Sequence, residues 1–206
     1  MLRRVRWLAY GLIVVVLLAT GAVWFSRWRS DAVSTVAGVS LPGGVSVGGP
    51  FTLTDDHGQS VTDASYRGRW MLVYFGYTFC PDVCPTELQT ISAALDKLGP
   101  KSAEVVPLFI TIDPQRDTAG ALAGYVKLFD NRLIGLTGTP EQIAAVAKEY
   151  RVYYAKVTPK NSSDYLMDHS SFVYLMGPDG RFRALFRQGM TPQELAADIQ
   201  TRLGSS

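Results

Sequence analysis

The sequence predicts an α/β fold in which a mixed β-sheet is flanked by helices and preceded by an N-terminal transmembrane helix. Segments typical of strands and of helices alternate from about residue 50 to the C-terminus. Near the N-terminus, residues 7–25 read WLAYGLIVVVLLATGAVWF and contain no charged side chain. The composition, with 47% hydrophobic and 18% charged residues, is that of a globular chain with a substantial core.

The apolar run at residues 7–25 is interpreted as a membrane anchor. At ~1.5 Å of rise per residue, its helix would nearly cross a hydrocarbon core of ~30 Å. Its ends carry aromatic side chains, which favour the headgroup level. The alternative is a cleaved signal peptide with a weak small-residue site at 19–21. The aromatic residues beyond that site and the length of the run favour an uncleaved anchor, so a cytoplasmic stub and anchor are expected at residues 1–29.

The flanking charges indicate how the anchor is oriented. Three arginines precede the run and two follow it, which points weakly to a cytoplasmic N-terminus and a domain outside the cytoplasm. The segment before the run is too short for an organelle transit peptide, so we expect a single-pass protein of a bacterial inner membrane whose domain faces the periplasm. The net charge is only +2 and the basic excess lies in this terminal region, so nucleic-acid binding is not expected.

A linker separates the anchor from the folded part. Residues 30–49 are rich in Gly, Ser, Val and Pro, which predicts a flexible tether with a reach of ~25 Å. The folded domain is expected at residues 50–206. It would therefore search a zone close to the membrane surface.

The first half of the domain reads as a hairpin followed by a βαβ unit. Alternating apolar and polar residues at 51–54 and 59–62, on either side of a turn signal, predict paired strands. The continuous apolar runs at 71–77 and 104–112 predict buried central strands. Between them, apolar residues at helical spacing predict a helix at 85–98, which opens with a proline and stops at a Gly-Pro pair.

The second half adds two helices, a hairpin and a terminal helix. Asp117 or Thr118 is a candidate N-cap for a helix that runs to Phe129, and Thr139 and Thr191 are candidate N-caps for the two later helices. The expected later elements are strands at 133–136, 152–157, 171–176 and 181–186 and helices at 140–150 and 192–203. This order gives a mixed sheet with helices on both faces, which is the thioredoxin-like plan.

Both cysteines of the chain lie in one motif, C-x-x-x-C, between a central strand and a helix. Cys80 and Cys84 can face one another across one helical turn, and the N–H groups of the helix end are expected to favour the thiolate at Cys84. Two thiolates form a soft site that suits Cu(I), with Zn(II) as a competitor. A structural or redox disulfide is the alternative for an exported chain. Tyr77 and Phe79 are expected to form a hydrophobic wall beside the pair.

His169 is the second candidate ligand. It follows Asp168 just before an expected strand, and in this fold such a strand entrance can face the cysteine loop. Two thiolates and an imidazole suit copper in either oxidation state and leave a position open for a transfer partner.

Three segments together resemble the Sco family (SenC/PrrC group) of copper chaperones for cytochrome c oxidase. They are GYTFCPDVCP at 76–85, TIDPQRD at 111–117 and YLMDHS at 165–170, in the family's order and across the whole domain. Met167 stands where the family pattern more often has Val. The resemblance implies that Cys80, Cys84 and His169 bind copper. It also implies delivery to the dinuclear copper site of an oxidase subunit, or reduction of the cysteines of that site.

Three aspartates beside these residues have two readings each. Asp82 is either a docking charge for a copper donor or acceptor or a solvated loop residue. Asp113 either contacts the site or a partner, or belongs to a turn. Asp168 either orients His169 or begins a turn. His57 matches no motif and is interpreted as a surface residue.

Thiol–disulfide exchange with a partner protein is the competing function. Redox enzymes of this fold usually carry C-x-x-C, whereas this chain has C-x-x-x-C and a distant histidine that exchange does not require. Peroxide chemistry at Cys80 would need a thiol of low pKa, for which no motif is apparent. Because copper binds only the reduced pair, a thiol reductant outside the cytoplasm is expected as a partner.

Overall fold

The computed structural model describes residues 47–160 and 164–204. The expected stub, anchor and most of the linker lie outside these residues. Within the described part, no helix is both long and apolar enough to span a membrane. The chain from Gly38 to Ser206 forms one compact unit.

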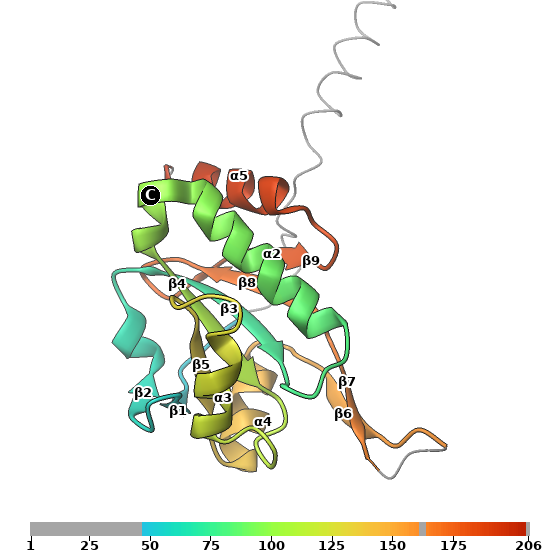
Figure 1. Ribbon diagram of the computed structural model, residues 1–206. Coiled ribbons are helices and arrows are strands. Elements are labelled where there is room, and N and C mark those ends of the chain that lie inside the picture. The colour runs from blue at the N-terminus through green and yellow to red at the C-terminus, as the bar shows by residue number, and fades with distance from the viewer. Residues whose placement is uncertain (1–46, 161–163, 205–206) are drawn as a thin grey trace, which may run out of the picture. The chain divides into compact units, whose positions relative to one another are not determined.

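The described part of that unit is built on a seven-stranded mixed sheet with the order β2-β1-β5-β4-β3-β8-β9 (Figure 1). The neighbouring strands β3, β4 and β5 run parallel, while β8 joins β3 antiparallel and pairs in turn with β9. The strands are β1 (Thr52–Asp55), β2 (Ser60–Thr62), β3 (Trp70–Gly76), β4 (Val105–Thr111), β5 (Ile134–Thr137), β8 (Phe172–Met176) and β9 (Phe182–Arg187). The predicted thioredoxin-like α/β architecture is therefore confirmed.

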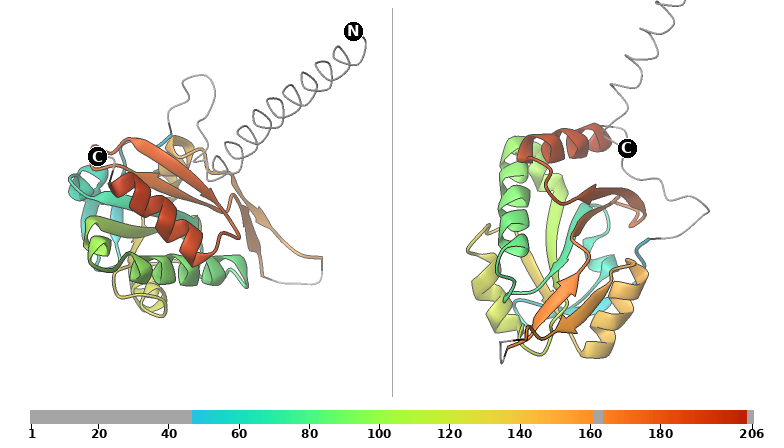
Figure 2. Two further views of the ribbon diagram at one scale, coloured as in Figure 1. Left: turned by 90° about the horizontal axis from the view of Figure 1, so that it is seen from above. Right: turned by 90° about the vertical axis from the view of Figure 1, so that its right-hand side faces the viewer.

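Helices cover both faces of this sheet (Figure 2). The helices α2 and α3 lie on one face with α5 beside α2, and α4 lies on the other. The helices are α2 (Val83–Leu98), α3 (Ala119–Val126), α4 (Pro140–Glu149) and α5 (Pro192–Leu203), and two short 3₁₀ helices are η1 (Asp63–Tyr66) and η2 (Gly99–Glu104). Thr139 and Thr191 are N-caps as the sequence predicts, and each also forms a capping box; Thr118 rather than Asp117 caps α3.

Aromatic side chains from the central strands fill the core on both sides of the sheet. The centroid of the Tyr74 ring lies 6.2 Å from that of Phe109, which in turn lies 5.6 Å from that of Tyr125 on α3. On the opposite face, Phe75 packs against Tyr150, which directly follows α4. The alternation of β3 thus carries Tyr74 to one core layer and Phe75 to the other.

A two-stranded ribbon lies outside the main sheet. It consists of β6 (Tyr154–Val157) and β7 (Leu166–His169), which pair antiparallel with each other and with no strand of the seven-stranded sheet. The sequence predicted β6, but it placed His169 in a loop before the next strand. The side chains of β7 alternate between exposed and more buried positions, so Met167 and His169 face inward while Asp168 faces solvent.

Candidate metal centre

The two cysteines are positioned by the loop that joins β3 to α2. Asp82 is the N-cap residue, so α2 begins earlier than predicted and Cys84 lies in its first turn. Cys80 lies two residues before this cap. A Cβ atom on Gly76, the last residue of β3, would lie 2.9 Å from the Cys84 sulfur, so only glycine leaves this sulfur its space.

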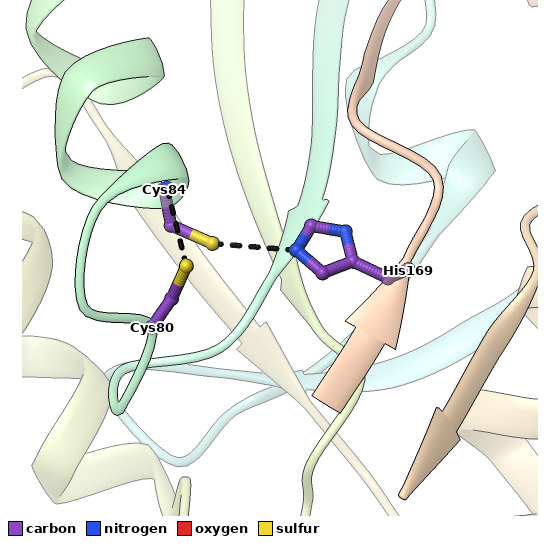
Figure 3. A group of neighbouring side chains, drawn as sticks. All are labelled: Cys80, Cys84 and His169. Carbon is purple, nitrogen blue, oxygen red and sulfur yellow. Dashed lines mark hydrogen bonds between the residues drawn. The ribbon is translucent and has the colours of Figure 1, made fainter. Parts of the chain in front are cut away.

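The structure brings together the three residues that the sequence singled out (Figure 3). The sulfur atoms of Cys80 and Cys84 and a ring nitrogen of His169 all lie within 4.8 Å of one another. The Cys84 sulfur is 3.6 Å from His169 Nε2. Both cysteines are buried and carry free thiols, and His169 is half-buried. His169 lies 85 positions after Cys84 and 89 after Cys80 in the sequence, yet all three residues share one site.

The two thiols differ strongly in acidity. A hydrogen bond from the Cys84 thiol lowers the pKa of Cys80 to about 4, and a hydrogen bond with His169 adds to this effect. The backbone N–H of Cys84 also donates to the Cys80 sulfur over 3.3 Å. The bond with Cys80, followed by burial, raises the pKa of Cys84 above its usual value. The prediction that the helix end favours a thiolate at Cys84 is therefore wrong, because the helix N–H group donates to Cys80.

The ring of His169 is oriented so that Nε2, the nitrogen that could bind a metal, faces the two cysteines. Its Nδ1 lies 3.1 Å from the carbonyl oxygen of Ser170. Because a carbonyl oxygen only accepts hydrogen bonds, Nδ1 is the donor in this contact, and Nε2 is the ring nitrogen that faces the sulfurs. The rings of Tyr74 and Tyr77 meet the imidazole edge-to-face at 6.5 and 6.0 Å. These contacts fix the orientation of the ring.

Asp117 anchors the cysteine loop through hydrogen bonds to its carboxylate. This fully buried carboxylate accepts hydrogen bonds from the backbone N–H and the hydroxyl of Thr78, at 3.0 and 2.5 Å. It also accepts one from the hydroxyl of Thr111 at the end of β4, at 2.6 Å. The sequence offered Asp117 as a helix cap, whereas its position ties the loop before Cys80 to the adjacent strand.

The other predicted residues occupy distinct places. Asp82 and Asp168 are exposed, and the contact that could orient His169 comes from the carbonyl of Ser170 rather than from Asp168. Asp113 is buried and pairs with Arg116. His57 is exposed in its turn, as expected.

An open groove leads to the centre. Its volume is ≈ 440 Å³, and Cys80 and His169 line it. The other residues that line it come from the cysteine loop, the start of α2, the ribbon and the segment between β7 and β8: Tyr77, Pro81, Asp82, Val83, Val157, Leu166, Met167, Asp168 and Ser171. Apolar side chains and two exposed aspartates therefore surround the accessible side of the site.

Two buried residues near the site were not among those singled out from the sequence. The Tyr74 hydroxyl has no hydrogen-bond partner among the described residues, yet it lies close enough to Cys84 that each group shifts the pKa of the other. Glu87 is 4% exposed, and burial raises its pKa to about 7. Its position three residues after Cys84 on α2 could have drawn attention to it, but its burial depends on the packing of α2 against the sheet.

A family model described as SCO1/SenC matches residues 40–204. The human "Protein SCO1 homolog, mitochondrial" is 46% identical over 159 residues, which are 76% of this chain and 53% of that protein. The Arabidopsis thaliana "Protein SCO1 homolog 1, mitochondrial" is 51% identical over 141 residues, which are 68% of this chain and 42% of that protein. The chain thus spans about half the length of these relatives.

Solved structures with copper bound are also similar. Arabidopsis thaliana ScoI with copper bound superimposes with a TM-score of 0.74 at 44% identity, covering 78% of this chain and 99% of that one. Bradyrhizobium japonicum ScoI with copper bound gives a TM-score of 0.70 at 48% identity, covering 75% and 98%.

Proposed function

The chain belongs to the SCO1/SenC family, and on that premise we propose that it is a copper metallochaperone that binds one copper ion through Cys80, Cys84 and His169 and supports assembly of the dinuclear copper site of cytochrome c oxidase. The observation that carries the proposal is that two sulfurs and a ring nitrogen of His169 lie within 4.8 Å of one another. Copper is the cargo of this protein rather than a resident cofactor.

The donor set fits copper. Thiolate and imidazole ligands suit Cu(I), and three ligands leave a position open through which a partner can take the metal. Cys80 is poised as a thiolate, so loading requires the loss of one further proton, from Cys84. Relatives at 44% and 48% identity are known with copper bound, which supports the same cargo here.

The groove suggests where a partner docks. An oxidase subunit that offers its own copper ligands would enter beside Cys80 and His169, between apolar side chains and the carboxylates of Asp82 and Asp168. These two exposed acids favour a partner surface that is basic near its copper ligands. Asp113, which is buried, contributes from within the fold rather than as a docking charge.

The proposed location rests on the residues before the domain. The uncharged run 7–25 and its flanking arginines support an anchor in a bacterial inner membrane, with the domain in the periplasm and residues 30–49 as its tether. In that compartment the cysteines would oxidise to a disulfide, so a thiol reductant must restore the copper-binding form.

Thiol–disulfide exchange is the second candidate function, and the asymmetry of the two thiols favours it. A thiolate at Cys80 beside a protonated, fully buried thiol at Cys84 is the arrangement in which one sulfur attacks and the other resolves. This activity would reduce the cysteines of a partner before the metal is delivered.

Copper binding by the unit 38–206 tests the proposal. The reduced protein receives one equivalent of Cu(II) without oxygen, and visible absorption and electron paramagnetic resonance are recorded beside His169→Ala. A stable sulfur-to-copper charge-transfer band that weakens or decays in the variant supports the chaperone. Rapid bleaching to a disulfide in both proteins, with no copper retained, would instead favour thiol–disulfide exchange.

A further inference from the structure

The position of His169 depends on a ribbon that is weakly held by its own strands. The ribbon of β6 and β7 is not part of the main sheet. A two-stranded ribbon is marginally stable by itself in water, so contacts outside its backbone ladder must fix it against the domain. These contacts decide how far His169 lies from the two sulfurs.

Arg116 supplies such contacts to the ribbon. Its Nη1 donates to the carbonyl oxygen of Tyr165, the residue before β7, over 3.1 Å, and its guanidinium lies 3.8 Å from the centre of the Tyr165 ring. Its Nε pairs with the buried carboxylate of Asp113, which also accepts a hydrogen bond of 2.9 Å from the Tyr165 hydroxyl. Each of three residues thus makes a polar contact with the other two beside the start of β7: Arg116, Asp113 and Tyr165.

The same guanidinium holds the cysteine loop. It lies 4.6 Å from the centre of the Phe79 ring and 5.8 Å from that of Tyr77. Phe79 directly precedes Cys80 and is 61% exposed, so Arg116 stacks on a ring that is otherwise largely open to solvent. The expectation that Phe79 forms a wall around the cysteines is thereby corrected, because its ring packs on Arg116 and faces solvent.

One nitrogen of the Arg116 guanidinium is in an unfavourable environment. Its Nη2 is buried and makes no hydrogen bond with the described residues. An unpaired buried donor destabilises the fold, and such a group in a folded protein calls for an explanation. The explanation offered by the contacts is geometric, since one planar group must reach the Cys80 loop and the His169 ribbon at once.

We propose that Arg116 is a positioning residue that clamps the β6–β7 ribbon to the cysteine loop and thereby sets the distance from His169 to Cys80 and Cys84. This inference rests on the proposed function, because copper is its probe. Lysine would keep the charge, but it lacks the planar group that donates to Tyr165 and Asp113 while it stacks on the rings.

A thermodynamic cycle with His169 tests the clamp. Cu(I) affinity is measured by competition with a chelator for the unit 38–206 and its Arg116→Lys variant, each with and without His169→Ala. Loss of a residue that orients a metal ligand typically lowers affinity ~10–100-fold, and we expect a loss of this order when His169 is present and less than ~2-fold when it is absent. The nitrogen hyperfine coupling of the Cu(II) form should weaken in Arg116→Lys.

Arg132→Lys is the matched control, because Arg132 pairs with Asp96 and Asp130 away from the site, and it should leave copper binding unchanged. Should Arg116→Lys fail to fold, Tyr165→Phe removes only the hydroxyl bond to Asp113 and should show the same dependence on His169 with a smaller loss. An equal loss with and without His169, or full affinity with unchanged nitrogen coupling, overturns the clamp alone. Full affinity in His169→Ala by itself overturns the ligand set and the clamp together.

Discussion

The unequal acidity of the two thiols gives a sharp prediction for the metal-free protein. The pKa of Cys80 is lowered to about 4 from 9.0, chiefly by the hydrogen bond from the Cys84 thiol. At pH 7 an ordinary thiol of that starting pKa is only ~1% ionised, whereas Cys80 is almost fully ionised. Cys84 remains protonated and has no exposed surface. Alkylation of the reduced protein should therefore modify Cys80 first.

The absolute rate of alkylation is a poor measure of this acidity. A thiolate loses nucleophilicity as its pKa falls, by ~100-fold over a drop of about 5 pH units, which roughly cancels the gain in ionised fraction at pH 7. The pH dependence does not cancel. Between pH 8 and pH 5 the reaction of an ordinary thiol slows ~1000-fold, whereas that of Cys80 should slow less than ~2-fold.

Short pulses of iodoacetamide at several pH values, read by mass spectrometry with a chelator present, measure this profile. Cys84→Ala removes the principal donor, so the labelling of Cys80 should then slow by at least ~10-fold between pH 8 and pH 5. Cys84→Ser is the matched control, because its hydroxyl can still donate and should preserve more of the flat profile. A tenfold decline per pH unit below pH 8 in the unmodified chain, or faster labelling of Cys84, would refute the reasoning.

Three further substitutions test the surroundings of the site. Gly76→Ala places a Cβ atom 2.9 Å from the Cys84 sulfur and should displace it. The affinity for Cu(I), measured by competition with a chelator, should therefore fall ~10-fold or more. Unchanged affinity would mean that the sulfur can shift without weakening copper binding. Tyr74→Phe removes a buried hydroxyl that has no hydrogen-bond partner among the described residues, so urea unfolding should show stability equal to or up to ~1 kcal/mol above the parent, and a loss of ~2 kcal/mol or more would contradict the assignment. Glu87→Gln tests the buried acid, whose pKa is raised from 4.5 to about 7. The folded state therefore binds this proton more tightly than the unfolded chain does. The parent protein consequently loses stability as the pH rises from about 4.5 through about 7. The stability gained by Glu87→Gln over the parent should grow by about 2–3 kcal/mol between pH 4.5 and pH 8 after allowance for solvent screening, and an equal gain at both pH values would contradict it. The comparison between Glu87→Gln and the parent is needed because the ionisation of Cys80 also changes stability between these pH values. That ionisation raises the stability of both proteins as the pH rises, so it cancels in the difference between them.

Much of the fold was predictable because local patterns carry it. Continuous apolar runs identified β3 and β4, and threonines followed by prolines located α4 and α5 with their caps. The ribbon was the main exception. Its strand β7 (Leu166–His169) has only four residues, and its pairing partner β6 is separated from it by a segment whose sequence shows weak periodicity. No local pattern therefore identified β7 as a strand.

The candidate ligands were also evident from residue types and motifs. Cys80 and Cys84 stand in one short motif, and the segments around them and His169 resemble one family across the domain. The direction of the ionisation was not predictable in this way. It depends on which sulfur receives the Cys84 N–H group and the Cys84 thiol proton, and this follows from the path of the loop between β3 and α2.

The sequence by itself determined the thioredoxin-like order of elements, the three candidate ligands and the family, because these depend on periodicity, residue type and short motifs. Only the tertiary structure decided that Cys80 is the ionised thiol, that Asp117 anchors the loop before it, and that Arg116 joins that loop to the ribbon of His169. Each of these facts is an interaction between segments distant in the chain. Its strength depends on distance, burial and the direction of a hydrogen bond, which exist only once the chain is folded.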